Sequence, residues 1–218
     1  VYTFTVNEVA DENGTETTNG SGMTYDSNIC TVTVDVTDNK QGALVADVTY
    51  SNNVNSSVTD KAQFNNTYKA SMNYGAEGAG GINVTKQMLD RPMANNEFSF
   101  TIEGVESADN SVSADEANAK LTEADKNFQN TAAAENDTAT MEKLQSMSFN
   151  QDDAGKTFSY LVSETIPADG DKLAAVAYDQ SQYRVDIEVV DNGNGTMHTV
   201  TTVTKAKASD GTAASEVV

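Results

Sequence analysis

The sequence is poor in the residues that cross-link a chain, interrupt its strands or carry positive charge. Its 218 residues include one cysteine and two prolines. A single cysteine excludes an internal disulfide framework and any metal site that needs several cysteines. No apolar run approaches the roughly 20 residues that a transmembrane helix requires, and the first residues lack the pattern of a signal peptide. We therefore expect no membrane insertion.

Basic side chains are scarce: 13 lysines and arginines face 33 acidic residues, which gives a formal net charge of −20. Polyanions such as nucleic acids are repelled by a surface of this sign, so we expect no nucleic-acid partner. The acidic residues are scattered rather than grouped, which favours a solvated surface over an acidic tail. Hydrophobic residues make up 38% of the chain, enough for one large domain or two small ones.

Alternation of apolar and polar residues is the strongest pattern and indicates half-buried strands. Two segments rich in Asn, Asp and Gly, 38–42 and 191–195, predict hairpin connections with positive φ. We therefore predict an all-β fold, with Cys30 as a small buried apolar residue of a strand. The predicted strands are 2–9, 29–36, 44–50, 82–86, 98–102, 158–162, 183–189 and 197–203.

One segment has a different composition. Residues 114–144 are rich in Ala, Glu, Lys and Asn, as helices are, but their apolar periodicity is poor. We predict a polar, partly helical insertion in the second domain, with one or two short helices, that forms a mobile surface excursion.

The chain repeats itself at an interval of about 153 residues. Three pairs have this spacing: Tyr25 and Tyr178, Asp38 and Asp191, and Gly42 and Gly195. The stretch 2–8 matches 158–164 at a slightly larger spacing of 156 residues. We predict that residues 1–72 are the C-terminal part of one repeat, that residues 73–81 are a Gly-rich joint, and that residues 82–218 are a second repeat without its last strand. The chain would then be a piece of a longer array.

Two glutamates occupy equivalent places in the repeat. Glu8 and Glu164 each follow an aromatic-x-aromatic-x-Val pattern, so each shares a strand face with apolar residues. A carboxylate on an apolar face, twice over, favours a buried functional group over a solvated charge. Asn66 lies between Phe64 and Tyr68 and is predicted on an alternating strand face, with a turn residue as the alternative. Lys86 ends a predicted strand, where a lysine can also reach the solvent along its apolar stem.

The order of these motifs resembles the streptococcal pilin isopeptide-linkage domain, which is found in major pilins and repetitive adhesins of Gram-positive bacteria. The shared order is a strand with Lys86, the strand 97–101, the strand with Glu164, the pair Tyr178–Asp179, an alternating hairpin, and a Phe-x-Asn-x-Tyr strand such as 64–68. The resemblance covers essentially the whole chain, apart from the long segment 107–144.

The resemblance implies tandem immunoglobulin-like (Greek-key) β-sandwiches. It also implies a lysine on the first strand that condenses with an asparagine on the last, with loss of ammonia and with a buried glutamate as proton shuttle. Lys86 and Glu164 would be the lysine and glutamate of the second domain, and Glu8 and Asn66 the glutamate and asparagine of the first. Their partners, a lysine before Val1 and an asparagine after Val218, would lie outside this sequence. Such a triad needs no external cofactor.

The function implied is that of a structural stalk repeat of a cell-surface pilus or adhesin, anchored in the cell wall, whose partners are neighbouring repeats of the same polypeptide. It is not an enzyme with turnover, because it would cross-link only itself. The alternative is an adhesive module in which the segment 107–144 or a strand edge binds a host glycan or protein. The single histidine, His198, has no nucleophile or metal-ligand context, so we expect a surface imidazole and no metal site.

Overall fold

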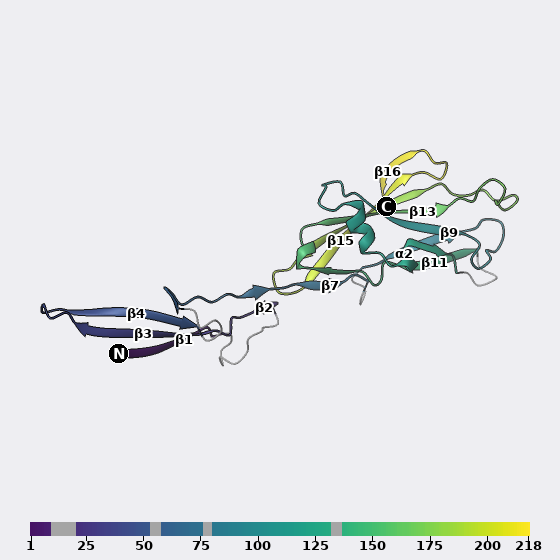
Figure 1. The fold of residues 1–218 in the computed structure, drawn as a ribbon. Helices are drawn as coiled ribbons and strands as arrows, with labels where there is room; N and C mark the ends of the chain where they lie inside the picture. The colour runs from purple at the N-terminus through teal and green to yellow at the C-terminus, as the bar shows by residue number, and fades with distance from the viewer. Residues whose placement is uncertain (10–20, 53–57, 76–79, 132–136) are drawn as a thin grey trace. The chain divides into compact units, whose positions relative to one another are not determined.

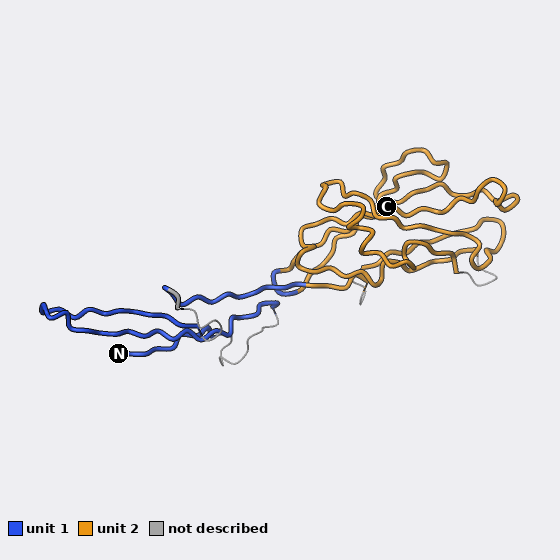
Figure 2. The backbone as a smooth tube through the Cα atoms, viewed as in Figure 1, with its two compact units in different colours: residues 1–70, 193–195 blue, residues 71–192, 196–218 orange. Residues whose placement is uncertain are grey.

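A computed structural model describes residues 1–9, 21–52, 58–75, 80–131 and 137–218 of the chain (Figure 1). These residues form two units, which Figure 2 colours separately. Unit 1 comprises residues 1–70 with 193–195, and unit 2 comprises residues 71–192 with 196–218. Strands predominate in both units, so the all-β prediction is confirmed. No helix in the described ranges is both long and apolar enough to cross a membrane.

Unit 1 is built on a four-stranded antiparallel sheet in the order β1-β3-β4-β5 (Figure 1). Its strands are β1 (Tyr2–Asn7), β3 (Ile29–Asp38), β4 (Leu44–Asn52) and β5 (Val58–Thr59). Two further short strands, β2 (Met23–Thr24) and β6 (Thr67–Tyr68), pair with each other. The predicted hairpin connects β3 to β4, and Lys40 and Gly42 supply its positive φ angles of 62° and 86°.

The sheet of unit 1 leaves apolar side chains in contact with solvent. Phe4 is 55% exposed and Val6 39% exposed, although both lie on the face that the alternation predicts to be internal. Within the described part of unit 1, the buried apolar residues are Cys30 and Ala70, so the prediction for Cys30 is confirmed. The apolar interior expected beside Glu8 is not formed by β1, because the described residues place no second layer over it.

Unit 2 contains a six-stranded antiparallel sheet in the order β10-β9-β13-β14-β15-β16, and two strand pairs, β8 with β11 and β7 with β12. The sheet strands are β9 (Ser99–Val105), β10 (Asn127–Gln129), β13 (Thr157–Thr165), β14 (Gln182–Asp191), β15 (Met197–Lys207) and β16 (Ala213–Val217). The paired strands are β7 (Ser71–Asn73), β8 (Ile82–Gln87), β11 (Thr138–Lys143) and β12 (Ser148–Asn150), and a 3-10 helix follows at Gln151–Asp153.

One face of the large sheet forms the core of unit 2. Alternate residues of its central strands are buried, as a period of two requires: Phe100, Ile102, Phe158, Tyr160, Val162, Val185, Ile187 and Val189. Phe149 of β12 covers this face, with its ring centroid 5.1 Å from that of Phe158, and Tyr74 packs edge-on against Phe149 at 6.2 Å. Burial of aromatic side chains of this size is the main stabilising contribution to such a core.

The two units share one three-stranded arrangement with the same register. In unit 1, β1 pairs with β3 through Tyr2 and Val34, and in unit 2, β13 pairs with β14 through Phe158 and Ile187. The hairpin pairs Asp38–Leu44 and Asp191–Met197 likewise correspond. Spacings of 156 and 153 residues relate these pairs, as in the sequence repeat. The repeated sequence therefore folds into repeated strand pairing.

The prediction of a mobile surface excursion at 114–144 is wrong. Two short helices are present, α1 (Ala114–Ala119) and α2 (Glu123–Lys126), but the segment contributes buried side chains to unit 2 from both helices, from β11 and from the turns next to them. The buried residues are Ala117, Leu121, Asp125, Asn130, Ala139, Met141 and Leu144. Helix α1 lies so close to β9 that a Cβ on Gly104 would come within 2.6 Å of the Asn118 nitrogen. The helix needs a glycine beneath it, and the segment is part of the fold.

Candidate functional site

A buried ion pair lies between β8 and β13 in unit 2. The Lys86 Nζ atom is 2.7 Å from the Glu164 Oε2 atom. The two side chains are only 10% and 5% exposed. Lys86 follows Ile82 and Val84 on the inward face of β8, and Glu164 follows Tyr160 and Val162 on the inward face of β13. The strand period therefore brings both charged groups inside.

Aromatic rings line this pair. The Lys86 Nζ atom lies 4.4 Å from the centroid of the Phe98 ring, a cation–π distance. Phe98 packs edge-on against Tyr178, with centroids 5.9 Å apart. Burial raises the pKa of Glu164 above its ordinary value, the hydrogen bond and charge of Lys86 oppose this, and the negative charge of Asp179 adds to it. The carboxyl group therefore holds a proton more tightly than an exposed glutamate does.

One oxygen of Glu164 is not used by the lysine. The Oε1 atom is buried and has no hydrogen-bond partner among the described residues. A buried carboxylate oxygen without a donor is costly, so its presence calls for a functional reason. An apolar hollow of about 290 Å³ lies beside β8 and is lined by residues that include Val84, Val162, Val185 and Val203.

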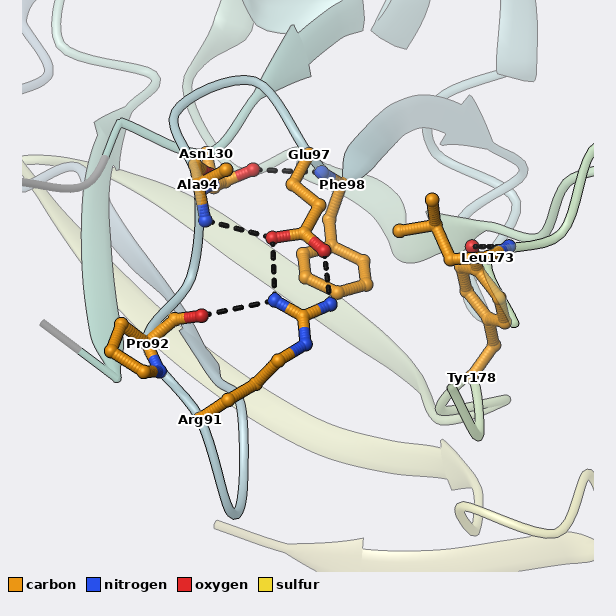
Figure 3. Close-up of polar contacts among 8 residues, drawn as sticks. All are labelled: Arg91, Pro92, Ala94, Glu97, Phe98, Asn130, Leu173 and Tyr178. Carbon is orange, nitrogen blue, oxygen red and sulfur yellow. Dashed lines mark hydrogen bonds and ion pairs between the residues drawn. The ribbon is translucent and has the colours of Figure 1, made fainter. Parts of the chain in front are cut away.

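A loop after β8 fixes the aromatic wall (Figure 3). The guanidinium of Arg91 binds both oxygens of the Glu97 carboxylate and also donates to the Pro92 carbonyl oxygen at 2.9 Å. The Ala94 N–H donates to Glu97 Oε2 at 2.7 Å. The hydrogen bond from Arg91 is the main cause that lowers the pKa of Glu97 below its ordinary value. The ion pair therefore holds the loop closed in front of Phe98.

Three further hydrogen bonds hold Phe98 and Tyr178 in place (Figure 3). The fully buried Asn130 accepts from the Phe98 N–H at 2.7 Å and donates to the Ala94 carbonyl oxygen at 2.7 Å. The Tyr178 hydroxyl accepts from the Leu173 N–H at 3.2 Å. The position of the ring beneath Lys86 is thus determined by the backbone on both sides.

Unit 1 holds a second arrangement around its own glutamate. The Asn66 side-chain Nδ2 donates to Glu8 Oε1 at 2.7 Å. The other oxygen of Glu8, Oε2, is buried and has no hydrogen-bond partner among the described residues. Asn66 itself is exposed, and it precedes β6 by one residue instead of lying within the strand, which corrects the prediction of a strand position.

Asp26 organises this arrangement. Its backbone N–H donates to Asn66 Oδ1 at 2.9 Å, and its carboxylate accepts from the Asn65 N–H at 2.7 Å. The carboxylate also accepts from the Asn28 N–H at 2.9 Å. These hydrogen bonds, the one from Asn65 most of all, lower the pKa of Asp26. Both polar atoms of the Asn66 amide therefore have a partner.

The two glutamates stand in complementary surroundings. Glu164 uses one oxygen for a lysine, and Glu8 uses one oxygen for an asparagine. Of the predicted residues, the structure brings together Lys86 with Glu164 and Asn66 with Glu8, while Lys86 and Asn66 belong to different units.

A known family matches most of the chain. The model of the FctA family, described as a Spy0128-like isopeptide containing domain, matches residues 1–69 and 82–214. The chain belongs to this family. The resemblance to streptococcal pilin isopeptide-linkage domains is thereby confirmed, and the match includes the segment 107–144 that had been set aside. A search of curated proteins found no match.

Several residues around the two glutamates were not predicted. Phe98 was identified as part of a motif, but its position under Lys86 follows from the loop and not from a pattern. Asp179 was named only as part of the Tyr178–Asp179 motif and Asp26 was not singled out, although the two aspartates recur at an interval of 153 residues. His198 is exposed, as predicted, and its Nδ1 lies 2.6 Å from Asn192 Oδ1. The described residues contain no group of three or more His, Cys, Asp or Glu that could hold a metal.

Proposed function

We propose that the chain is a structural stalk repeat of a Gram-positive cell-surface pilus or adhesin, strengthened by intramolecular Lys–Asn isopeptide bonds that form autocatalytically. The observation that supports this most strongly is that Glu8 and Glu164 each have one hydrogen-bonded carboxylate oxygen and one without a partner among the described residues. Each carboxylate binds one reactant of the same condensation, the Lys86 amine in unit 2 and the Asn66 amide in unit 1, and keeps one buried oxygen without a donor among the described residues. The reactant that each site lacks, a lysine in unit 1 and an asparagine in unit 2, would be carried by another strand.

The reaction needs only groups of this kind. A neutral lysine amine attacks the Cγ atom of the asparagine side chain, and a C–N bond forms. The glutamate accepts the proton that the amine releases and passes it to the departing amide nitrogen, so that the old C–N bond breaks and ammonia leaves. The product is a secondary amide, and no oxidant or cofactor is consumed. Holding the reactants in contact replaces the bimolecular step, which can remove about 7–11 kcal/mol of barrier.

The surroundings of Glu164 suit a proton shuttle. Its pKa is raised, chiefly by burial, so the carboxylate can take a proton from the Lys86 ammonium across 2.7 Å. Only 10% of the Lys86 side chain and 5% of the Glu164 side chain are exposed beside the Phe98 wall, and this exclusion of water favours the neutral reactants. Arg91, Glu97 and Asn130 would act by holding that wall and not by contacting the reactants.

The proposal includes the finer architecture. The two units would be successive immunoglobulin-like β-sandwiches in a cell-wall-anchored fibre whose partners are neighbouring repeats, and their joint would lie before β7, which belongs to unit 2. A bond between the first and last strands of a domain would carry tension through the domain without unravelling it. The adhesive alternative relied on the segment 107–144 or on a strand edge as the binding surface. That segment contributes Ala117 and Leu144 to the core of unit 2, so no specific observation favours the alternative.

The test is a ligation to Lys86. A synthetic peptide with the sequence of residues 62–68, which contains Asn66, is incubated with the full chain, and intact mass is followed. We expect an adduct one ammonia lighter than the sum of the two, mapped by fragmentation to Lys86. A peptide with Ala in place of Asn66 should give none. The apolar hollow beside β8 would receive the aromatic side chains of the peptide.

Variants make the test decisive. Glu164→Gln and Glu164→Ala should abolish the adduct, while hydrogen exchange of β14 reports whether each variant is folded. Lys143→Met is the matched control, because Lys143 also lies over a phenylalanine ring, at 4.3 Å from Phe128, but away from Glu164. An adduct that forms equally in the folded Glu164 variants, or no adduct with the wild-type chain, would rule out the proposed chemistry.

A further inference from the structure

The hydrogen bonds of the Asn66 amide polarise it in the direction that favours attack by an amine. Its oxygen faces a hydrogen-bond donor, the Asp26 N–H at 2.9 Å, and its nitrogen faces the Glu8 carboxylate at 2.7 Å. When an amine adds to the Cγ atom, negative charge develops on the oxygen and the nitrogen becomes the leaving group. A donor at 2.7–3.1 Å from that oxygen stabilises the charge, as in an oxyanion hole.

The direction in which the Asp26 backbone N–H points depends on the Asp26 side chain. One carboxylate oxygen accepts from the Asn28 N–H at 2.9 Å and so closes a turn that starts at Asp26 itself. The other accepts from the Asn65 N–H at 2.7 Å and so holds the backbone next to the reacting asparagine. The pairing of β2 with β6 continues the contact through Met23 and Tyr68. One aspartate therefore fixes both the donor and the strand that carries the amide.

Unit 2 contains the counterpart of the Asp26 turn. Asp179 follows Tyr178 as Asp26 follows Tyr25, and its Oδ1 accepts from the Ser181 N–H at 2.8 Å, the counterpart of the Asn28 bond. Asp179 also lies close enough to Glu164 for its charge to act on that carboxyl group. The same turn thus occurs in both units, closed by the Asn28 N–H in unit 1 and by the Ser181 N–H in unit 2.

We propose that Asp26 in unit 1, and Asp179 in unit 2, are positioning residues of the isopeptide site, whose carboxylates orient their own backbone N–H toward the carbonyl oxygen of the reacting asparagine. This inference rests on the proposed function and adds a group to it. The carboxylates exchange no proton in the reaction. They hold the strand and the donor while the glutamate moves the proton.

The first test measures the rate of peptide ligation to the full chain. Asp179→Ala should lower the rate at saturating peptide by about a hundredfold, the cost of a misplaced reactant. Asp179→Asn keeps an acceptor for the Ser181 N–H and should restore part of that rate. Asp210→Ala is the matched control, because Asp210 closes the same kind of turn with the Thr212 N–H at 3.0 Å. If Asp179→Ala changes only the peptide concentration at half-maximal rate, Asp179 merely binds the strand and the inference is wrong.

The second test does not depend on the reaction. In the full chain, Asp26→Ala should speed hydrogen exchange of the Asn65 N–H and shift the side-chain amide resonances of Asn66. The control Asp38→Ala removes an equivalent turn bond to the Lys40 N–H, 2.8 Å long, and should leave both unchanged. Unchanged Asn66 resonances in Asp26→Ala would overturn the inference. If they shift as expected while the wild-type chain forms no adduct, the positioning role stands and the proposed chemistry falls.

Discussion

Units 1 and 2 share the same three-stranded pairing, but they differ in whether the apolar face of these strands is buried. The inward residues of β13 in unit 2, Phe158 and Tyr160, are 2% and 0% exposed, whereas Tyr2 and Phe4 at the corresponding places of β1 are 63% and 55% exposed. The strand pairing is the same in register in both units. Alternation therefore specifies which residues share a face, while a second layer of structure decides whether that face becomes a core.

The largest expected effect tests this difference directly. Phe158→Ala should lower the free energy of unfolding of unit 2 by about 3–5 kcal/mol, because it leaves a cavity against Phe149. The corresponding change in unit 1, Tyr2→Ala, should cost no more than about 0.5 kcal/mol, since it removes a solvent-exposed side chain. Hydrogen exchange followed by mass spectrometry, with peptides assigned to each unit, measures both. Equal losses would mean that the sheet of unit 1 is covered in solution.

The next effect concerns the Lys86–Glu164 pair of unit 2 and depends on pH. Lys86→Met leaves Glu164 buried without its cation and should cost about 3 kcal/mol at neutral pH. The folded-state pKa of Glu164 is already raised, and it rises further when Lys86 is removed. A group of this kind stabilises fully below its ordinary pKa of 4.5, and this contribution is lost as pH rises. The deficit of the variant should therefore be small at pH 4 and large at pH 8, in urea unfolding of the full chain.

Lys40 provides the control for that experiment. It pairs with Asp38 in the hairpin of unit 1, and its side chain is 86% exposed. Lys40→Met should produce no pH-dependent deficit, because an exposed pair is screened by solvent. A Lys86→Met deficit that is the same at pH 4 and pH 8 would contradict the raised pKa of Glu164.

The smallest effect concerns the loop in front of Phe98. Glu97→Gln should cost about 1 kcal/mol above pH 4.5, a value that allows for solvent screening of Arg91. The folded-state pKa of Glu97 is lowered, so its contribution is present above the ordinary value of 4.5 and lost as pH falls below it. The wild-type chain and the variant should thus converge in stability near pH 3. Glu123→Gln, at a carboxylate that is 84% exposed, should show no difference at either pH.

The comparison also shows how far the sequence could predict the structure. All the strands with a clear period of two formed, and the pairing of Lys86 with Glu164 agrees with the family resemblance. Helix α1 has six residues, too few to show an apolar periodicity, and its buried contact is a single alanine, Ala117. The role that we propose for Asp26 depends on a backbone N–H, which every residue other than proline carries. Patterns of side chains do not report such groups.

The contacts at the two glutamates also have a consequence for the order of folding. The Lys86–Glu164 contact joins residues 78 positions apart, and the Asn66–Glu8 contact joins residues 58 positions apart. Contacts of such long range form late, because loop closure must come first. A bond made at these places would form only in chains that have completed their topology. Because denaturants do not break covalent bonds, such a bond would then keep the joined strands together even under unfolding conditions. Covalent closure would in this way act as a proofreading step, and mature fibres would contain only repeats that had folded correctly once.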